Sequence, residues 1–424
     1  MPRGSFSTFS SLSELISLIQ RLVSTISSSR RQNAFFIFAN YSSLLINFVS
    51  GIVLARALGP ELRGNFALIA SYCLLVYSLS SFNISSGTLQ ARFITNSQIA
   101  DSRAKLLKLP ILIGLVLTPV LSSVILVFLW NNPSLQKYFL EFAIVCFGSF
   151  VGAVTVFTNS VLVTNGMISR LSINRFLGLS CFSVSVVFLY LFDLITIEKL
   201  LLAQLLSNFL IAVIAIFLYL QPSEIRLPDP RDVLKLSIKG LPRFVFEYSI
   251  PVLSYSYISS THGAMTLGVF VIAWGWTSLV DALYPIAESR TYKLLHTQPG
   301  VKIILQGLKA RTGEIVLFGL IIMPTCFFIP FIFGKDYQSG VQLALMLIVL
   351  KIITQVTNLL ETILMFNRQI SKLLIQTVLW VIIFVLCWTT LDFLSWKMLL
   401  LPYFCAQGIR LLTAFWYSRN LLLS

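Results

Sequence analysis

Charged residues are scarce in this chain of 424 residues. Asp, Glu, Lys and Arg make up 11 % of the sequence, which is less than half of the ~25 % usual in soluble domains. Hydrophobic residues make up 57 %, so too few polar groups remain to cover the outside of a soluble fold. Uncharged apolar runs of roughly 20 residues, long enough to cross a bilayer, recur along the chain. The sequence therefore predicts an all-α integral membrane protein.

Residues that carry enzyme chemistry are also few. The chain has only two histidines and none of the short motifs typical of zinc proteases, P-loop ATPases or serine hydrolases. Its six cysteines lie within apolar runs and form no C-x-x-C pair, which is typical of small buried side chains rather than disulfides or metal ligands. We therefore expect a protein that is not an enzyme, with no metal site and no cofactor.

The net charge of +15 does not indicate a nucleic-acid partner. The basic residues lie between hydrophobic runs, as they do in the cytoplasmic loops of membrane proteins. About twelve transmembrane helices are expected, near residues 34–55, 66–87, 110–130, 139–164, 174–192, 199–220, 241–261, 265–288, 313–334, 339–365, 370–391 and 398–418. Lys and Arg favour the connections on the side of the N-terminus by roughly four to one, so both termini are expected in the cytoplasm.

The segment before the first span, residues 1–33, lacks the continuous apolar core of a signal peptide. Apolar residues at helical spacing from Leu12 to Ile26 predict an amphipathic helix on the cytoplasmic membrane surface, with a disordered tail as the alternative. The predicted organisation is this N-terminal segment, a six-helix lobe at 34–220, a cytoplasmic linker at 221–240, a second six-helix lobe at 241–418 and a cytoplasmic tail at 419–424.

The two predicted lobes resemble each other at an offset of about 204 residues. Gly64 aligns with Gly268, and Pro119 aligns with Pro324 at an offset that differs by one. Because each half holds six spans, both halves insert the same way up and are predicted to be related by a pseudo-twofold axis along the membrane normal. Two bundles side by side leave a cleft, and in repeat transporters the substrate binds there while the bundles rock.

Five charged residues lie more than three residues inside the ends of the predicted spans, all in the second half. A charge near the bilayer centre costs at least ~2.5–3.5 kcal/mol, so such residues usually have a role. They are Glu247, Asp281, Lys351, Glu361 and Arg410. The three carboxylates, Glu247, Asp281 and Glu361, are candidates for binding a coupling H⁺ or Na⁺. Alternatively, the five groups pair across helices and hold the second bundle together.

The cations in this set are candidates for binding an anionic headgroup. Lys351 and Arg410 are expected near the membrane midplane, where an arginine fork and a lysine point charge suit phosphate oxygens. Arg56, at the outer end of the first span, is a third candidate. The sequence thus predicts a polar path through the second lobe for a negatively charged substrate.

Two stretches of the chain resemble a known transporter family. Residues 51–66, GIVLARALGPELRGNF, resemble the first-span signature of Wzx-type polysaccharide flippases, and residues 331–340, FIFGKDYQSG, resemble the family's turn before span 10. These flippases belong to the multidrug/oligosaccharidyl-lipid/polysaccharide (MOP) exporter superfamily, which also holds lipid II flippases and MATE multidrug exporters. The resemblance covers roughly residues 34–418.

The resemblance implies a flippase for an undecaprenyl-pyrophosphate-linked oligosaccharide in a bacterial inner membrane, serving surface polysaccharide synthesis such as that of O-antigen. It implies a V-shaped cleft between two six-helix lobes, often lined by cations, and partners that include membrane lipids and other polysaccharide assembly proteins. The first six spans of this chain depart from that pattern, because they hold few ionisable residues.

Two other functions stay open at this point. One is an ion-coupled multidrug or small-molecule antiporter of the same fold, which needs an apolar, acid-lined pocket. The other is a membrane-bound polysaccharide polymerase or acyltransferase, which needs catalytic groups gathered at one membrane face, commonly on a large outer loop. The midplane cations argue against the first, and the short predicted outer loops argue against the second.

Overall fold

The computed structural model describes residues 29–91, 103–130, 136–165, 167–221, 228–281, 301–366, 369–390 and 400–423. Every element in these ranges is a helix, as the all-α prediction requires. The predicted surface helix between Leu12 and Ile26 lies outside the described residues.

The helices of the first half begin with a long helix and end near residue 220. They are α2 (Ser29–Ser80), α3 (Ile84–Ala91), α4 (Arg103–Trp130), α6 (Phe139–Gly148), α7 (Val151–Thr164), α8 (Ile168–Leu191) and α9 (Ile197–Leu220).

The second half also begins with a helix of 52 residues. Its helices are α10 (Pro230–Asp281), α12 (Val301–Ile322), α13 (Ile329–Phe333), α14 (Gly340–Phe366), α15 (Ile370–Thr390) and α16 (Leu400–Leu423), with short 3₁₀ turns η2 (Met323–Phe328) and η3 (Lys335–Tyr337). By length and composition, eight helices of the described residues are able to cross a membrane.

Two of these helices, α2 and α10, are long enough to cross a bilayer twice, and each is kinked at a glycine. Gly59 has φ 67° and Gly263 has φ 83°, a left-handed conformation that glycine adopts without a steric penalty. Pro60 follows the first kink, and a residue that precedes proline is disfavoured in the α conformation. The two kinks are 204 residues apart, the offset of the sequence repeat.

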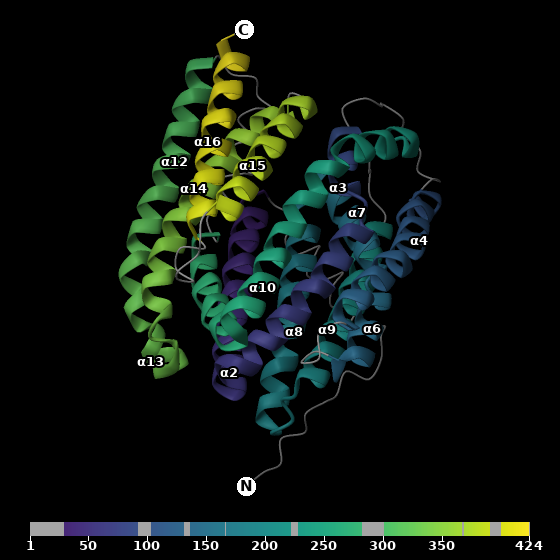
Figure 1. Ribbon diagram of the computed structural model, residues 1–424. Helices are drawn as coiled ribbons and strands as arrows, with labels where there is room; N and C mark the ends of the chain where they lie inside the picture. Colours follow the sequence, from purple (N-terminus) through teal and green to yellow (C-terminus); the bar gives the residue numbers. More distant parts are fainter. Residues whose placement is uncertain are drawn as a thin grey trace.

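The kinked helices lie at the centre, with one group of helices on each side (Figure 1). In one group, α8 and α4 pack on α2, and α9 packs on α7 and α8. In the other, α14 and α15 pack on α10, and α16 packs on both of them. We call these groups the first lobe and the second lobe. The most extensive contact between any two elements joins α2 to α10.

The two lobes meet at a pair of glycines. A Cβ on Gly64 would overlap the carbonyl oxygen of Ala264, and a Cβ on Gly268 would overlap that of Pro60. These residues are related in pairs by the offset of 204, so the contact is reciprocal, as a twofold axis requires. The pseudo-twofold axis predicted from the repeat therefore passes between Gly64 and Gly268.

The start of α10 crosses from one lobe to the other. Near its first turns it packs on α3 of the first lobe (Figure 1), where Asn83 Nδ2 donates to the Ser237 carbonyl at 3.3 Å. A Cβ on Gly87 would overlap the Val233 carbonyl oxygen, so the two backbones approach closely. A few residues further on, Arg243 already contacts the second lobe.

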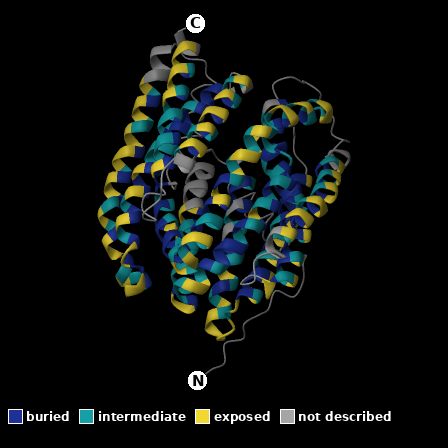
Figure 2. Cartoon of the chain, viewed as in Figure 1, coloured by how far each residue is buried: buried dark blue, intermediate teal, exposed yellow. Residues whose placement is uncertain are grey.

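Exposed residues lie along the outer faces of both lobes (Figure 2), and many of them are large and apolar. On the peripheral helix α4, Val116 and Val120 are more than half exposed, and so are Leu317 and Ile321 on its repeat counterpart α12. Contiguous apolar surface of this extent is unusual on soluble monomers and is typical of a membrane interaction surface. The exposure pattern agrees with a multi-span membrane protein.

Candidate functional site

Four charged side chains of the second lobe form one ion-pair network, which we call the charge cluster: Arg243, Glu247, Glu361 and Arg410. Arg410 Nε lies 2.6 Å from Glu361 Oε1, and its Nη2 donates to Glu361 Oε2 at 2.8 Å. This two-point geometry is the strong, planar form of an arginine–carboxylate pair. Arg243 Nη2 lies 2.5 Å from Oε2 of the same carboxylate.

Glu247 completes the charge cluster. Its Oε1 lies 2.9 Å from Arg243 Nε and 3.1 Å from Arg410 Nη2. Two arginines thus face two carboxylates, so the cluster is neutral as a whole. The side chain of Glu361 is only 3 % exposed, and breaking a buried pair by removing one partner typically costs ~3–5 kcal/mol. The cluster therefore ties α10, α14 and α16 together.

An amide on α15 joins the same network. Gln376 Nε2 donates to Glu361 Oε1 at 2.9 Å and to the Arg410 carbonyl at 2.7 Å. The Arg410 guanidinium also lies 5.7 Å from the centre of the Trp380 ring, within the range of a cation–π contact. Four helices of the second lobe are held at one buried point.

Three of the six residues predicted from the sequence meet in this cluster: Arg410, Glu247 and Glu361. The fourth member, Arg243, stands at the start of the predicted span 241–261 and is not among the residues predicted for the site, so its role is missed. The signal that would have found it is the spacing of Arg243 and Glu247, which places opposite charges one helical turn apart. The side chain of Asp281 lies outside the described residues.

Lys351 lies on α14, ten residues before Glu361 and therefore roughly 15 Å along the helix from the cluster. Its ammonium group lies 4.9 Å from the centre of the Trp274 ring on α10, a favourable cation–π distance. Lys351 and Arg410 thus occupy different levels of the second lobe.

Arg56 connects the two lobes near the kink of α2. Its Nε donates to the Ile332 carbonyl at 2.8 Å, and its Nη2 donates to the Phe331 carbonyl at 3.3 Å. Tyr337 O–H also donates to the Ala55 carbonyl at 3.3 Å, and burial raises the pKa of Tyr337 to about 12, so the hydroxyl keeps its proton. The first lobe is bonded to the α13–η3 segment at this end.

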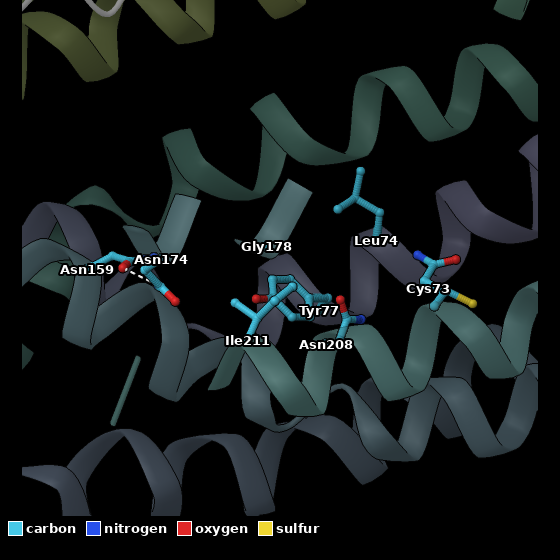
Figure 3. Close-up of a pocket in the computed structure, with 9 residues that line it drawn as sticks. Cys73, Leu74, Tyr77, Asn159, Asn174, Gly178, Asn208 and Ile211 are labelled. Carbon is cyan, nitrogen blue, oxygen red and sulfur yellow. Dashed lines mark hydrogen bonds between the residues drawn. The ribbon is translucent and has the colours of Figure 1, made fainter. Parts of the chain in front are cut away.

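The first lobe contains a cavity of about 290 Å³, shown in Figure 3. None of the described residues that line it is charged. We call it the amide pocket, because four of its nine lining residues are amides: Cys73, Leu74, Tyr77, Asn159, Asn174, Gly178, Gln204, Asn208 and Ile211. They come from α2, α7, α8 and α9.

Two acceptor atoms of this pocket lack a partner among the described residues. Asn174 Nδ2 donates to Asn159 Oδ1 at 2.6 Å, but Asn174 Oδ1 and Gln204 Oε1 are buried and accept no hydrogen bond. A buried unsatisfied polar group costs roughly 1–3 kcal/mol. The sequence prediction missed this pocket because it searched the spans for charges, and these amides come from three helices without a shared motif.

Comparisons by sequence identify no relative of this chain: no protein-family model and no curated protein matches it. Comparisons by structure find proteins of similar fold. An inward-facing multidrug resistance transporter of the MATE family and MOP superfamily matches with a TM-score of 0.67 and 14 % identity, over 91 % of this chain and 98 % of that one. An outward-facing transporter of the same description matches with a TM-score of 0.67 and 16 % identity, over 96 % of both chains.

A third match is a MOP superfamily transporter from Pyrococcus furiosus, described by a binding pocket of reverse polarity that suggests a different function. Its TM-score is 0.63 at 14 % identity, over 95 % of this chain and 97 % of that one. All three neighbours are transporters rather than enzymes. Across nearly its whole length, the chain therefore has the two-lobed fold of MOP-superfamily transporters.

Proposed function

We propose that this protein translocates a lipid-linked oligosaccharide with an anionic headgroup across a bacterial inner membrane by alternating access. One observation carries the choice of substrate: the carboxylates of Glu247 and Glu361 are each paired with two arginines. An exporter of organic cations needs a carboxylate whose charge is available to its substrate, and both of these are already neutralised by arginines. The polar groups that do line a cavity are uncharged amides.

The proposed substrate combines a polar, anionic headgroup with an apolar polyprenyl tail. A sugar headgroup is too polar to cross hydrocarbon unaided, while the polyprenyl tail is compatible with the surrounding lipid. Lys351, on a face of α14 directed toward α10, is the cation that we assign to the pyrophosphate. Arg410 holds the charge cluster together, and we assign it a supporting role instead.

Ion coupling through the cluster is a second part of the proposal. Glu247 is the most exposed member, with 28 % of its side chain accessible, so H⁺ or Na⁺ would reach it first. Binding there competes with Arg243 and Arg410 for the same carboxylate oxygen. In this coupling mechanism, the bound ion replaces an arginine contact at the Glu247 carboxylate.

The alternative substrate class is a multidrug cation, because two of the structural neighbours are multidrug resistance transporters. A reconstituted assay separates the two. Purified protein in liposomes is given a short-chain polyprenyl-pyrophosphate disaccharide, and movement is followed by lectin access from outside the vesicle. The same vesicles are loaded with a fluorescent organic cation, with and without proton and sodium gradients.

We expect lectin-detected translocation by the wild type and at least a tenfold slower rate for Lys351→Ala. Lys335→Ala is the matched control, because this lysine is exposed on η3. Export of the organic cation without movement of the lipid-linked sugar would overturn the proposed function. Equal rates for Lys351→Ala and wild type would overturn the assigned role of Lys351.

A further inference from the structure

The composition of the amide pocket selects a class of ligand. Each Asn or Gln side chain presents one carbonyl acceptor and two N–H donors, and four such groups converge on one cavity without a charged residue among its described lining. An organic cation would find no carboxylate there, and a phosphate would find no cation. A ligand that both donates and accepts, and carries no charge, matches these groups best.

The atoms without partners point to a ligand that donates hydrogen bonds. Asn174 is 1 % exposed, and its amide nitrogen is already committed to Asn159. Its Oδ1, and Oε1 of Gln204, are buried acceptors without a donor among the described residues. Two hydroxyl groups on one ligand would supply the two missing donors.

The apolar side chains of the pocket require that the ligand also has an apolar face. Figure 3 shows the Asn159–Asn174 pair at one end of the lining, with Tyr77 and Ile211 between that pair and Leu74. A sugar ring combines a rim of hydroxyls with an apolar C–H face, which suits amides beside an aromatic and an aliphatic side chain. The volume of about 290 Å³ is at the lower end of the ~300–1,000 Å³ typical of ligand pockets, which fits a single ring rather than a chain or a lipid tail.

We infer that the amide pocket binds one uncharged sugar unit of the translocated headgroup. This inference rests on the proposed function, in which the phosphates bind elsewhere, at Lys351 of the second lobe. The first lobe then binds a neutral sugar of the headgroup, and the second lobe binds its phosphates. It follows that the transporter discriminates between neutral and acidic sugars within the first lobe.

A thiol-protection experiment on the full-length chain tests the inference. Leu74 lines the pocket and is 52 % exposed, so Leu74→Cys offers a reactive reporter above the labelling of the native cysteines. The labelling rate with a maleimide is measured in proteoliposomes with methyl glucoside, methyl glucuronide or tetraphenylphosphonium as the added probe. Val184→Cys on α8, which is 58 % exposed and does not line the pocket, is the matched control.

Methyl glucoside should slow labelling at position 74 at least threefold, whereas the glucuronide and the organic cation should not, and position 184 should respond to none of them. Combining Leu74→Cys with Gln204→Leu or Asn208→Leu should raise the glucoside concentration needed for protection about tenfold. Protection by the cation alone, or no protection by the glucoside, overturns the inference.

The experiment also separates this inference from the proposed function. Lectin-detected translocation without glucoside protection leaves the proposed function standing and removes the sugar site. Protection without translocation of the polyprenyl-linked disaccharide leaves a neutral-sugar pocket in a transporter of another substrate. Both measurements use the same reconstituted protein, so a folding defect in a variant is recognised by its failure in both.

Discussion

The two lobes share a fold but differ in how they hold buried polar groups. The second lobe concentrates four charges at one point and neutralises them internally. The first lobe distributes uncharged amides around a cavity and leaves two of their acceptors unsatisfied. Buried acceptors without a donor among the described residues occur in the second lobe as well, at Gln376 Oε1. Those of the first lobe differ because they belong to residues that line a cavity with room for another molecule. Repeated architecture has therefore produced one lobe with a structural polar core and one with a candidate binding core.

The largest expected effect breaks the charge cluster. Glu361→Gln leaves two buried arginines facing a single carboxylate and should lower the free energy of unfolding by about 3–5 kcal/mol. The melting temperature in detergent measures this loss. The control is Glu314→Gln, whose pair with Arg311 is partly exposed and should contribute at most ~1 kcal/mol. Equal melting temperatures for the two variants would show that the cluster does not hold the second lobe together.

A smaller effect is expected where the lobes touch. Gly64→Ala and Gly268→Ala each drive a methyl group into a backbone carbonyl of the opposite half, and overpacking of this kind typically costs ~1–3 kcal/mol. Because the contact is reciprocal, the two variants should lose similar stability. Gly51→Ala in α2 and Gly275→Ala in α10 add a methyl group to open space and should cost nothing. Unequal losses at Gly64 and Gly268 would argue against a symmetric contact.

One amide from each lobe sharpens the comparison further. Gln376→Leu removes two hydrogen bonds from the charge cluster and should cost roughly 1–3 kcal/mol of stability. Asn208→Leu, in the amide pocket, should change stability by less than about 1 kcal/mol while lowering the translocation rate. Thermal melts and the lectin assay on both variants test this. If Gln376→Leu lowers the translocation rate and Asn208→Leu lowers the stability instead, the binding surface lies in the second lobe.

The smallest expected effect concerns the bonds between the lobes at Arg56. Arg56→Ala removes two hydrogen bonds to the carbonyls of Phe331 and Ile332, so amide exchange in α13 should become faster by up to about tenfold. Hydrogen-exchange mass spectrometry of residues 329–333 measures it. Lys335→Ala, an exposed neighbour in η3, should leave that exchange unchanged.

Much of the fold follows from sequence patterns. Hydropathy predicts the long helices. The matched glycines predict the pseudo-twofold axis, because glycine is needed where two backbones approach as closely as they do at Gly64 and Gly268. The ends of spans are less well defined by hydropathy, and Arg243, at the start of the predicted span 241–261, was not counted among the charges within spans for that reason. The opposite charge of Glu247, one helical turn after Arg243, is a signal of pairing that hydropathy does not contain.

The candidate site was predicted less completely than the fold. Sequence reasoning identified Arg410, Glu247 and Glu361 by their cost in a membrane, but not which of them pair, because pairing across α10, α14 and α16 depends on helix packing. The amide pocket was missed altogether. Asn159 and Asn174 lie on separate helices and hydrogen-bond only in the folded chain, and an isolated amide in an apolar run has no distinctive spacing.

The path of α10 bears on how the lobes move. Its backbone is bonded to Asn83 of the first lobe at Ser237 and to the charge cluster of the second lobe from Arg243 onward. Between these anchors lie Gly240 and Pro242, the residue types that most weaken a helix against bending. If one lobe tilts against the other, these few residues must flex, so stiffening them would slow the proposed transport without altering any group assigned to the substrate.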